Sequence, residues 1–186
     1  MFFPQSIPEV VLVRPKRHGD DRGFFVEAFH AERFEQNGVH GPFVQDNHSL
    51  SRQKGVVRGL HFQIPPTPQA KLVRCTRGAI LDVAVDIRAG SPTYGEHVAV
   101  ELTAENGWQL YVPVGFAHGF ATLVPDTEVQ YKVTGYYAPD CDRGIAFDDP
   151  ALGIDWPVDR ASAILSEKDR ALPPLSASPP QFRYGE

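Results

Sequence analysis

Short runs of alternating apolar and β-branched residues, separated by turn residues, recur along most of this 186-residue chain. Regular spacing of short strands is typical of a β-sandwich or β-barrel. Seventeen prolines and sixteen glycines supply the turns and favour few long helices. The clearest predicted strands cover residues 9–13, 56–64, 71–76, 80–87, 97–102, 109–112 and 128–133.

Two short helices are expected to interrupt the strands. One covers residues 30–36 and stops at Asn37-Gly38, because glycine is a common residue just after a helix C-terminus. The other begins at Ser166 and is ended by Pro173-Pro174. No repeat, low-complexity segment or linker divides the sequence, so residues 1–186 are predicted to form a single domain.

Charge and composition narrow the classes of partner. A formal net charge of −5 argues against binding to nucleic acid or to a membrane surface, which usually requires a basic protein. The N-terminus has no basic region followed by an apolar run, and no stretch reaches transmembrane length, so we expect a cytoplasmic protein without a signal peptide. Two cysteines are too few for a disulfide framework. A local cluster of basic residues between positions 58 and 77 suits a small anionic ligand.

Three side chains that could take part in acid–base chemistry lie on the inward faces of predicted strands. His61 shares a strand face with Gly59 and Gln63, since successive residues of a strand point to opposite sides. Lys71 follows ten residues after His61, at the start of the next strand. The ring of Tyr131 should point inward because it shares a face with apolar neighbours. If the core face is also the lumen of a barrel, these three side chains can converge there.

Each of these residues also has an ordinary structural explanation. A lone histidine or tyrosine in a strand is usually satisfied by its surroundings, although an inward-facing lysine is costly without a partner or ligand. Asp169 follows Ser166 by three positions, which is typical of a capping box at a helix N-terminus. Capping and pairing with a histidine are compatible, because a carboxylate has several acceptor sites.

Together, the four residues can remove a proton from a carbon next to a ketone group and return one to it. A neutral imidazole with a pKa of about 6.5 is suited to act as the base. A carboxylate on its other ring nitrogen fixes the tautomer, and a lysine ammonium stabilises the enolate oxygen. A tyrosine on the opposite face can return the proton and invert the carbon. The set His61, Asp169, Lys71 and Tyr131 therefore indicates epimerisation through an enolate.

Two segments resemble the paired motifs of a cupin barrel: Gly59-Leu60-His61-Phe62-Gln63, and Pro113-Val114-Gly115-Phe116-Ala117-His118-Gly119-Phe120. The resemblance implies an all-β double-stranded β-helix, or jelly-roll, with a few short helices. The first motif departs from that of metal-binding cupins, which have His-x-His followed by a glutamate. This chain has His61-Phe62-Gln63, then Thr67 and Pro68. Two histidines and an amide make a poor site for a divalent cation, so we expect no metal and no cofactor.

Over nearly its whole length the chain resembles the dTDP-4-dehydrorhamnose 3,5-epimerase family. The resemblance implies conversion of dTDP-4-dehydro-6-deoxy-D-glucose to dTDP-4-dehydro-L-rhamnose, by epimerisation at carbons 3 and 5, in dTDP-L-rhamnose biosynthesis. The blocks that carry it include Asp21-Arg22-Gly23-Phe24-Phe25, Gln45-Asp46-Asn47-His48-Ser49, Gly55-Val56-Val57-Arg58-Gly59-Leu60-His61-Phe62-Gln63, Asp82-Val83-Ala84-Val85-Asp86, Tyr136-Tyr137-Ala138-Pro139 and Ser166-Glu167-Lys168-Asp169.

The resemblance also assigns roles to residues of this sequence. It implies that His61 is the general base with Asp169 as its partner, that Lys71 steadies the enolate oxygen, and that Tyr131 donates the proton. Tyr137 matches the aromatic residue that stacks on thymine. Positions that hold the nucleotide or the sugar are matched by Arg22, Glu27, Gln45, Asn47, Arg58, His118, Asp142 and Lys168. Asp142 stands where many members carry a glutamate. The family is typically a homodimer whose N-terminal strand residues complete the neighbouring site, which makes Arg22 and Glu27 candidates to act in trans.

Three alternatives remain open on the sequence. The nearest is a 3-only or 5-only epimerase, or a ketoisomerase, that acts on another thymidine-diphosphate deoxysugar. A metal-dependent cupin is disfavoured by Gln63, Thr67 and Pro68. A non-catalytic sugar-binding barrel would have no need for an inward lysine beside a histidine.

Overall fold

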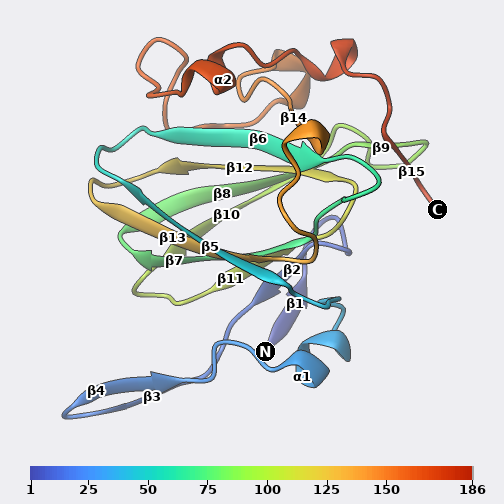
Figure 1. Ribbon diagram of the computed structural model, residues 1–186. Coiled ribbons are helices and arrows are strands. Elements are labelled where there is room, and N and C mark those ends of the chain that lie inside the picture. The colour runs from blue at the N-terminus through green and yellow to red at the C-terminus, as the bar shows by residue number, and fades with distance from the viewer. Residues whose placement is uncertain (186) are drawn as a thin grey trace.

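Two antiparallel sheets stack on one another in the computed structural model, which describes residues 1–185 (Figure 1). The six-stranded sheet runs in the order β1 (Phe2–Pro4), β2 (Val11–Val13), β11 (Gln109–Val112), β7 (Lys71–Arg77), β13 (Thr127–Val133) and β5 (Gln45–Ser51). The five-stranded sheet runs in the order β10 (His97–Thr103), β8 (Ala79–Asp86), β12 (Phe116–Thr122), β6 (Val57–Gln63) and β14 (Asp142–Gly144). Neighbours in each sheet are mostly distant in sequence, as in a cupin-type jelly-roll. The predicted fold class is confirmed.

The remaining elements are short. β3 (Arg17–Asp20) and β4 (Gly23–Val26) form a hairpin that extends away from the two sheets (Figure 1). The others are β9 (Arg88–Ala89), β15 (Phe182–Arg183), α1 (Ala31–Glu35), α2 (Glu167–Arg170) and the 3₁₀ helices η1 (Pro139–Cys141), η2 (Pro150–Leu152) and η3 (Leu175–Ala177). Both α-helices lie inside the predicted segments. Across residues 1–185 the structure contains no helix that is both long enough and apolar enough to span a membrane.

Two of the longer strands, β5 and β12, are not among the predicted runs, and burial explains why. Every residue of β12 is buried, so its sequence shows no alternation between apolar and polar side chains. β5 lies at the edge of its sheet and carries mostly polar residues, with exposure that alternates along the strand. β5 lines the site described below, and β12 carries His118, which lies directly behind it.

The main core lies between the sheets, where each fully buried aliphatic or aromatic side chain contributes about 1.5–3 kcal/mol. Its members from the two sheets include Val73, Leu110 and Val129, and Ala84, Leu102 and Phe120. A second cluster covers the outer face of the five-stranded sheet with side chains of the C-terminal segment, including Ile145, Leu152 and Leu175. This covering layer brings α2 against β6, as Figure 1 shows.

Glycines bring β6 and β12 unusually close together. Gly59 has φ of +120°, and a Cβ atom there would lie 2.6 Å from the Cα of Gly119 and 2.7 Å from the carbonyl oxygen of His118. A Cβ on Gly119 would lie 2.8 Å from the carbonyl oxygen of Arg58. These distances exclude any side chain, which explains a glycine in each of the two motifs. The close approach sets His61 opposite His118.

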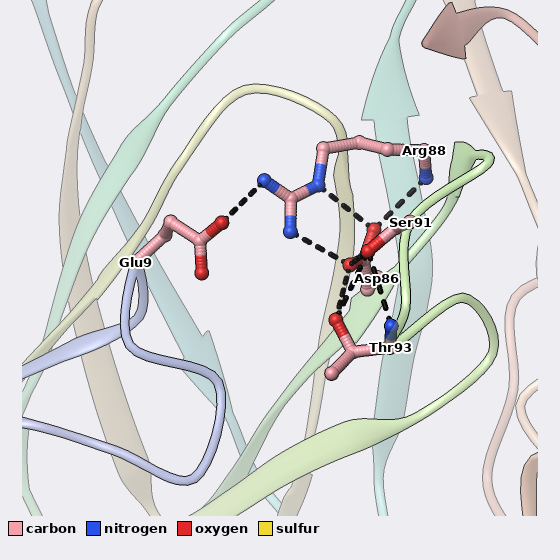
Figure 2. A network of polar contacts seen from close by, with 5 residues as sticks. All are labelled: Glu9, Asp86, Arg88, Ser91 and Thr93. Carbon is pink, nitrogen blue, oxygen red and sulfur yellow. Dashed lines mark hydrogen bonds and ion pairs between the residues drawn. The ribbon is translucent and has the colours of Figure 1, made fainter. Parts of the chain in front are cut away.

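A buried polar network fixes the end of β8 (Figure 2). The Asp86 carboxylate is fully buried and accepts hydrogen bonds from Arg88, Ser91 and Thr93. Arg88 also donates to Glu9 at 2.8 Å, which ties the N-terminal segment to the same point. Burial would raise the pKa of Asp86, but these hydrogen bonds hold it below its ordinary value. None of these residues lines the candidate active site.

Candidate active site

A hollow of about 310 Å³ opens between the two sheets. Its walls come from β6 and β14 on one side and from β5, β7 and β13 on the other. It is lined by Gln45, Asn47, His61, Phe62, Gln63, Gln69, Lys71, Tyr131, Tyr137 and Asp142. The volume lies at the lower end of the range for small-molecule sites. The predicted convergence of His61, Lys71 and Tyr131 is therefore confirmed.

His61 and Asp169 form a pair at the wall of this hollow. The Nε2 atom of His61 lies 2.5 Å from Oδ1 of Asp169, whose side chain is 5% exposed. The backbone N–H of Asp169 donates to Oγ of Ser166, so Asp169 occupies the predicted capping position. The same residue therefore both belongs to the helix cap and pairs with His61. Burial raises the pKa of Asp169, but the hydrogen bond to His61 and other favourable contacts hold it below its ordinary value. The carboxylate therefore orients the imidazole, and the second ring nitrogen can accept a proton.

Lys71 is a buried ammonium group next to this pair. Its Nζ atom donates to the carbonyl oxygen of His61 at 3.2 Å. Burial lowers the pKa of Lys71 to about 8, against the raising influence of Asp142 and Asp82. The group is mostly charged at neutral pH, and an ammonium carries three donors. Lys71 can thus offer a positive charge and hydrogen bonds to a ligand oxygen.

Tyr131 reaches the hollow from the sheet opposite His61. It lies on β13 between Asn47 of β5 and Val73 of β7. Burial raises the pKa of its hydroxyl, although the nearby positive charge of Arg58 acts in the other direction. The phenol therefore remains protonated at neutral pH and can act as a proton donor. A base and an acid face one cavity from two different sheets.

Hydrogen bonds and an ion pair connect the polar residues at the rim of the hollow, which are Gln45, Asn47, Tyr137, Asp142 and Lys168. Gln45 donates to Asn47 at 2.9 Å and accepts from the backbone N–H of Tyr137 at 3.2 Å. The Tyr137 hydroxyl donates to Oδ2 of Asp142, which also pairs with the ammonium of Lys168. The Tyr137 residue is 58% exposed, so its ring is accessible to a ligand.

His118 lies behind the hollow rather than at its surface. It is 5% exposed, and its Nε2 atom lies 2.8 Å from Oδ1 of the fully buried Asp82. Burial lowers the pKa of His118 despite the adjacent carboxylate. Sequence reasoning did not select Asp82, although an acidic residue inside the apolar strand β8 was the available signal. Its charge also acts on Lys71, so this pair belongs to the electrostatic surroundings of the site.

The other predicted binding residues lie outside the hollow. Arg58 is exposed and donates to the side chain of Ser51 and the backbone of Leu50, and its charge still influences Tyr131. Arg22 pairs with Asp20 on the projecting hairpin, and Glu27 pairs with Arg33. This single chain does not bring Arg22 and Glu27 to the remaining site residues.

Gln63 occupies the position of the second histidine in a metal-binding cupin. Its amide is committed to the backbone groups of Thr67, Tyr136 and Ala138. Within residues 1–185, no group of three or more His, Cys, Asp or Glu side chains is arranged to hold a metal ion. The absence of a metal requirement stays a prediction. Gln63 and Gln69 line the hollow but were not among the predicted site residues.

A second hollow, of about 360 Å³, lies by the outer face of the six-stranded sheet. Its charged side chains are already paired, Lys132 with Asp46 and Arg74 with Gln130. The His61–Asp169 pair and Lys71 are not part of it. The chemistry is therefore assigned to the hollow between the sheets.

Comparison with known proteins agrees with this geometry. The family model for dTDP-4-dehydrorhamnose 3,5-epimerase matches residues 4–177. The chain is 56% identical over 185 residues to a dTDP-4-dehydrorhamnose 3,5-epimerase from Sinorhizobium fredii, covering 99% of this chain and 94% of the relative. A dTDP-6-deoxy-D-glucose-3,5-epimerase from Legionella pneumophila, solved in complex with dTDP-4-keto-L-rhamnose, superposes with a TM-score of 0.94 at 45% identity, covering 100% of this chain and 99% of that one. A 3′-monoepimerase from Streptomyces bikiniensis, solved with dTDP-quinovose, gives 0.85 at 39% identity, with coverage of 93% and 87%.

Proposed function

The chain belongs to the dTDP-4-dehydrorhamnose 3,5-epimerase family, and we propose that it converts dTDP-4-dehydro-6-deoxy-D-glucose to dTDP-4-dehydro-L-rhamnose in dTDP-L-rhamnose biosynthesis. The observation that carries the proposal is the placement of His61 and Tyr131 on opposite sheets around one hollow, which Lys71 also lines. The reaction takes place in the cytoplasm, and the free, buried Cys75 and Cys141 are compatible with a reducing compartment.

Each epimerisation needs one proton removed and another returned to the opposite face. Carbons 3 and 5 both flank the 4-keto group, so the electrons of either broken C–H bond can pass to the keto oxygen. His61 takes the proton, held in position by Asp169 at 2.5 Å. Lys71 stabilises the enolate oxygen with its ammonium charge. Tyr131 delivers a proton to the other face and is then reprotonated from solvent, while the imidazolium releases its proton.

The rim residues suit the thymidine diphosphate part of the substrate. The exposed ring of Tyr137 is available to stack on the thymine base. Arg58 and Lys168 are suited to bind the diphosphate, because guanidinium and ammonium groups form charge-assisted hydrogen bonds to phosphate oxygens. Gln45 and Asn47 supply amide groups, while Asp142 lines the hollow itself and holds Lys168 beside it through their ion pair. His118 acts from behind, on the surroundings of Lys71.

The site is completed by a second copy of the chain in a homodimer. The hairpin β3–β4 extends away from the sheets (Figure 1), and its Phe24 and Phe25 are 62% and 71% exposed. A partner surface would bury these rings and would bring Arg22 and Glu27 to the neighbouring hollow. Mixing inactive Arg22→Ala and His61→Ala chains should restore activity, because a hybrid dimer retains one intact site. A fully active monomer in light scattering would contradict this assembly.

Product analysis tests the reaction itself. The protein is incubated in deuterium oxide with dTDP-4-dehydro-6-deoxy-D-glucose and a stereospecific reductase that accepts only the doubly inverted sugar. We expect deuterium at both carbons 3 and 5 and formation of dTDP-L-rhamnose. Inversion at one carbon alone would instead favour a monoepimerase, the activity named for the Streptomyces bikiniensis relative. A product with its keto group at carbon 3 would identify a ketoisomerase.

A further inference from the structure

The loop that carries Tyr137 is held by the side chain of Gln63. The Gln63 Nε2 group donates to the carbonyl oxygens of Thr67 at 2.7 Å and Tyr136 at 3.1 Å. Its Oε1 atom accepts from the backbone N–H of Ala138 at 2.8 Å. The hydrogen bonds therefore reach the residues directly before and after Tyr137.

These contacts replace regular secondary structure in that region. Residues 134–138 follow β13 without belonging to a helix or strand, and so do residues 64–70 after β6. The two loops touch, since a Cβ on Gly135 would lie 3.0 Å from the carbonyl oxygen of Pro68. Gln63 is only 3% exposed, so its amide lies in the interior, and its three hydrogen bonds are partly buried. Loss of the amide would leave these partly buried backbone groups without their protein partner, which loosens the connection between the two loops.

We propose that Gln63 is a positioning residue for nucleotide recognition, which presents the Tyr137 ring at the entrance of the hollow in the orientation needed for stacking. The inference rests on the proposed role of Tyr137 in binding thymine. A loop fixed in advance loses less conformational freedom when the ligand binds, and this strengthens binding. The contribution is the same in the ground state and the transition state, so it acts on affinity rather than on the chemical step.

The chemistry of the side chain supports an amide at this position. A glutamate could still accept from Ala138 but has no N–H group for the two carbonyl oxygens, and its charge would face them. A methionine of similar length would form none of the three hydrogen bonds. Gln63→Glu therefore removes the two hydrogen bonds that the amide donates, whereas Gln63→Met removes all three hydrogen bonds to the two loops.

Affinity for dTDP, measured by calorimetry, tests the proposal. The variants are Gln63→Met, Gln63→Glu, Tyr137→Ala and the double variant of Gln63→Met with Tyr137→Ala. Ser91→Ala is the matched control, because Ser91 is also buried and also donates and accepts, but its partners are Asp86 and Thr93 (Figure 2). Thermal unfolding of each variant measures its stability separately from its affinity for dTDP. If Gln63→Met does not fold, Gln63→Glu tests the proposal in its place.

We expect Tyr137→Ala to weaken dTDP binding by about 5-fold to 100-fold, the range of base–aromatic stacking. Each Gln63 variant should weaken it by about 3-fold to 10-fold, and the double variant should match Tyr137→Ala within about twofold, because Gln63 acts through the ring. Ser91→Ala should lose stability without losing affinity. Unchanged affinity in the Gln63 variants, or losses that multiply in the double variant, would overturn the inference alone. Unchanged affinity in Tyr137→Ala would overturn the stacking role and the inference together.

Discussion

The buried ammonium of Lys71 predicts an alkaline limit to the reaction. With a pKa of about 8, about nine tenths of the enzyme carries a charged Lys71 at pH 7 and about one tenth at pH 9. In the proposed mechanism the charged form of Lys71 stabilises the enolate, so its contribution is present below this pKa and lost above it. The profile of kcat/KM, which reports the free enzyme, should therefore bend near pH 8 and then fall about tenfold per pH unit. Tyr131 does not account for this limb, because its pKa is raised above its ordinary value of 10.0.

Three substitutions assign the alkaline limb to Lys71. Lys71→Arg keeps a positive charge that does not titrate below about pH 12, so the limb near pH 8 should vanish from whatever activity remains. Asp142→Asn should move the limb to lower pH, because the Asp142 charge raises the pKa of Lys71. Lys168→Met should move it to higher pH, since Lys168 acts in the opposite direction. Steady-state rates across pH 6 to 10 measure all three. A limb that stays near pH 8 in Lys71→Arg would refute the assignment.

Two other predictions concern binding and cofactors. Tyr137→Ala should raise KM about 5-fold to 100-fold with kcat nearly unchanged, since stacking acts alike on substrate and transition state; a collapse of kcat at saturating substrate would place Tyr137 in the chemical step. Dialysis against a strong chelator should leave turnover unchanged, because the Gln63 amide is committed to backbone groups; a loss that added zinc, iron or manganese restores would contradict this reading.

The inward side chains of the site follow from strand parity alone. Alternation places Lys71 and Tyr131 on the core face of their strands, and the spacing of Ser166 and Asp169 places the carboxylate in the first turn of α2. The contact between Asp169 and His61 does not follow from local pattern. It joins residues 108 positions apart and depends on how the C-terminal segment packs over β6.

The burial of His118 and Asp82 behind the site could likewise not be predicted from the sequence. A substrate-binding role for His118 stays a prediction, and the structure places this residue against Asp82 in the interior. Both residues of the pair depend on the packing of β12 against its two neighbours. Arg22 lies on the projecting hairpin, paired with Asp20 and away from the site residues of its own chain. Such long-range features need three-dimensional packing, because no periodicity in one strand encodes them.

Hydrogen exchange in deuterium oxide tests the two-sided mechanism most directly. His61→Ala removes the base, so exchange and epimerisation should both fall by about 10²-fold to 10⁴-fold. Tyr131→Phe keeps the base, Lys71 and the enolate. Its imidazolium is 29% exposed, can take up deuterium from solvent and can return a deuteron to the original face. Mass spectrometry of recovered substrate and stereochemical analysis of product should then show exchange that outlasts inversion. Equal loss of exchange and inversion in a Tyr131→Phe protein that still folds and binds dTDP would contradict the mechanism.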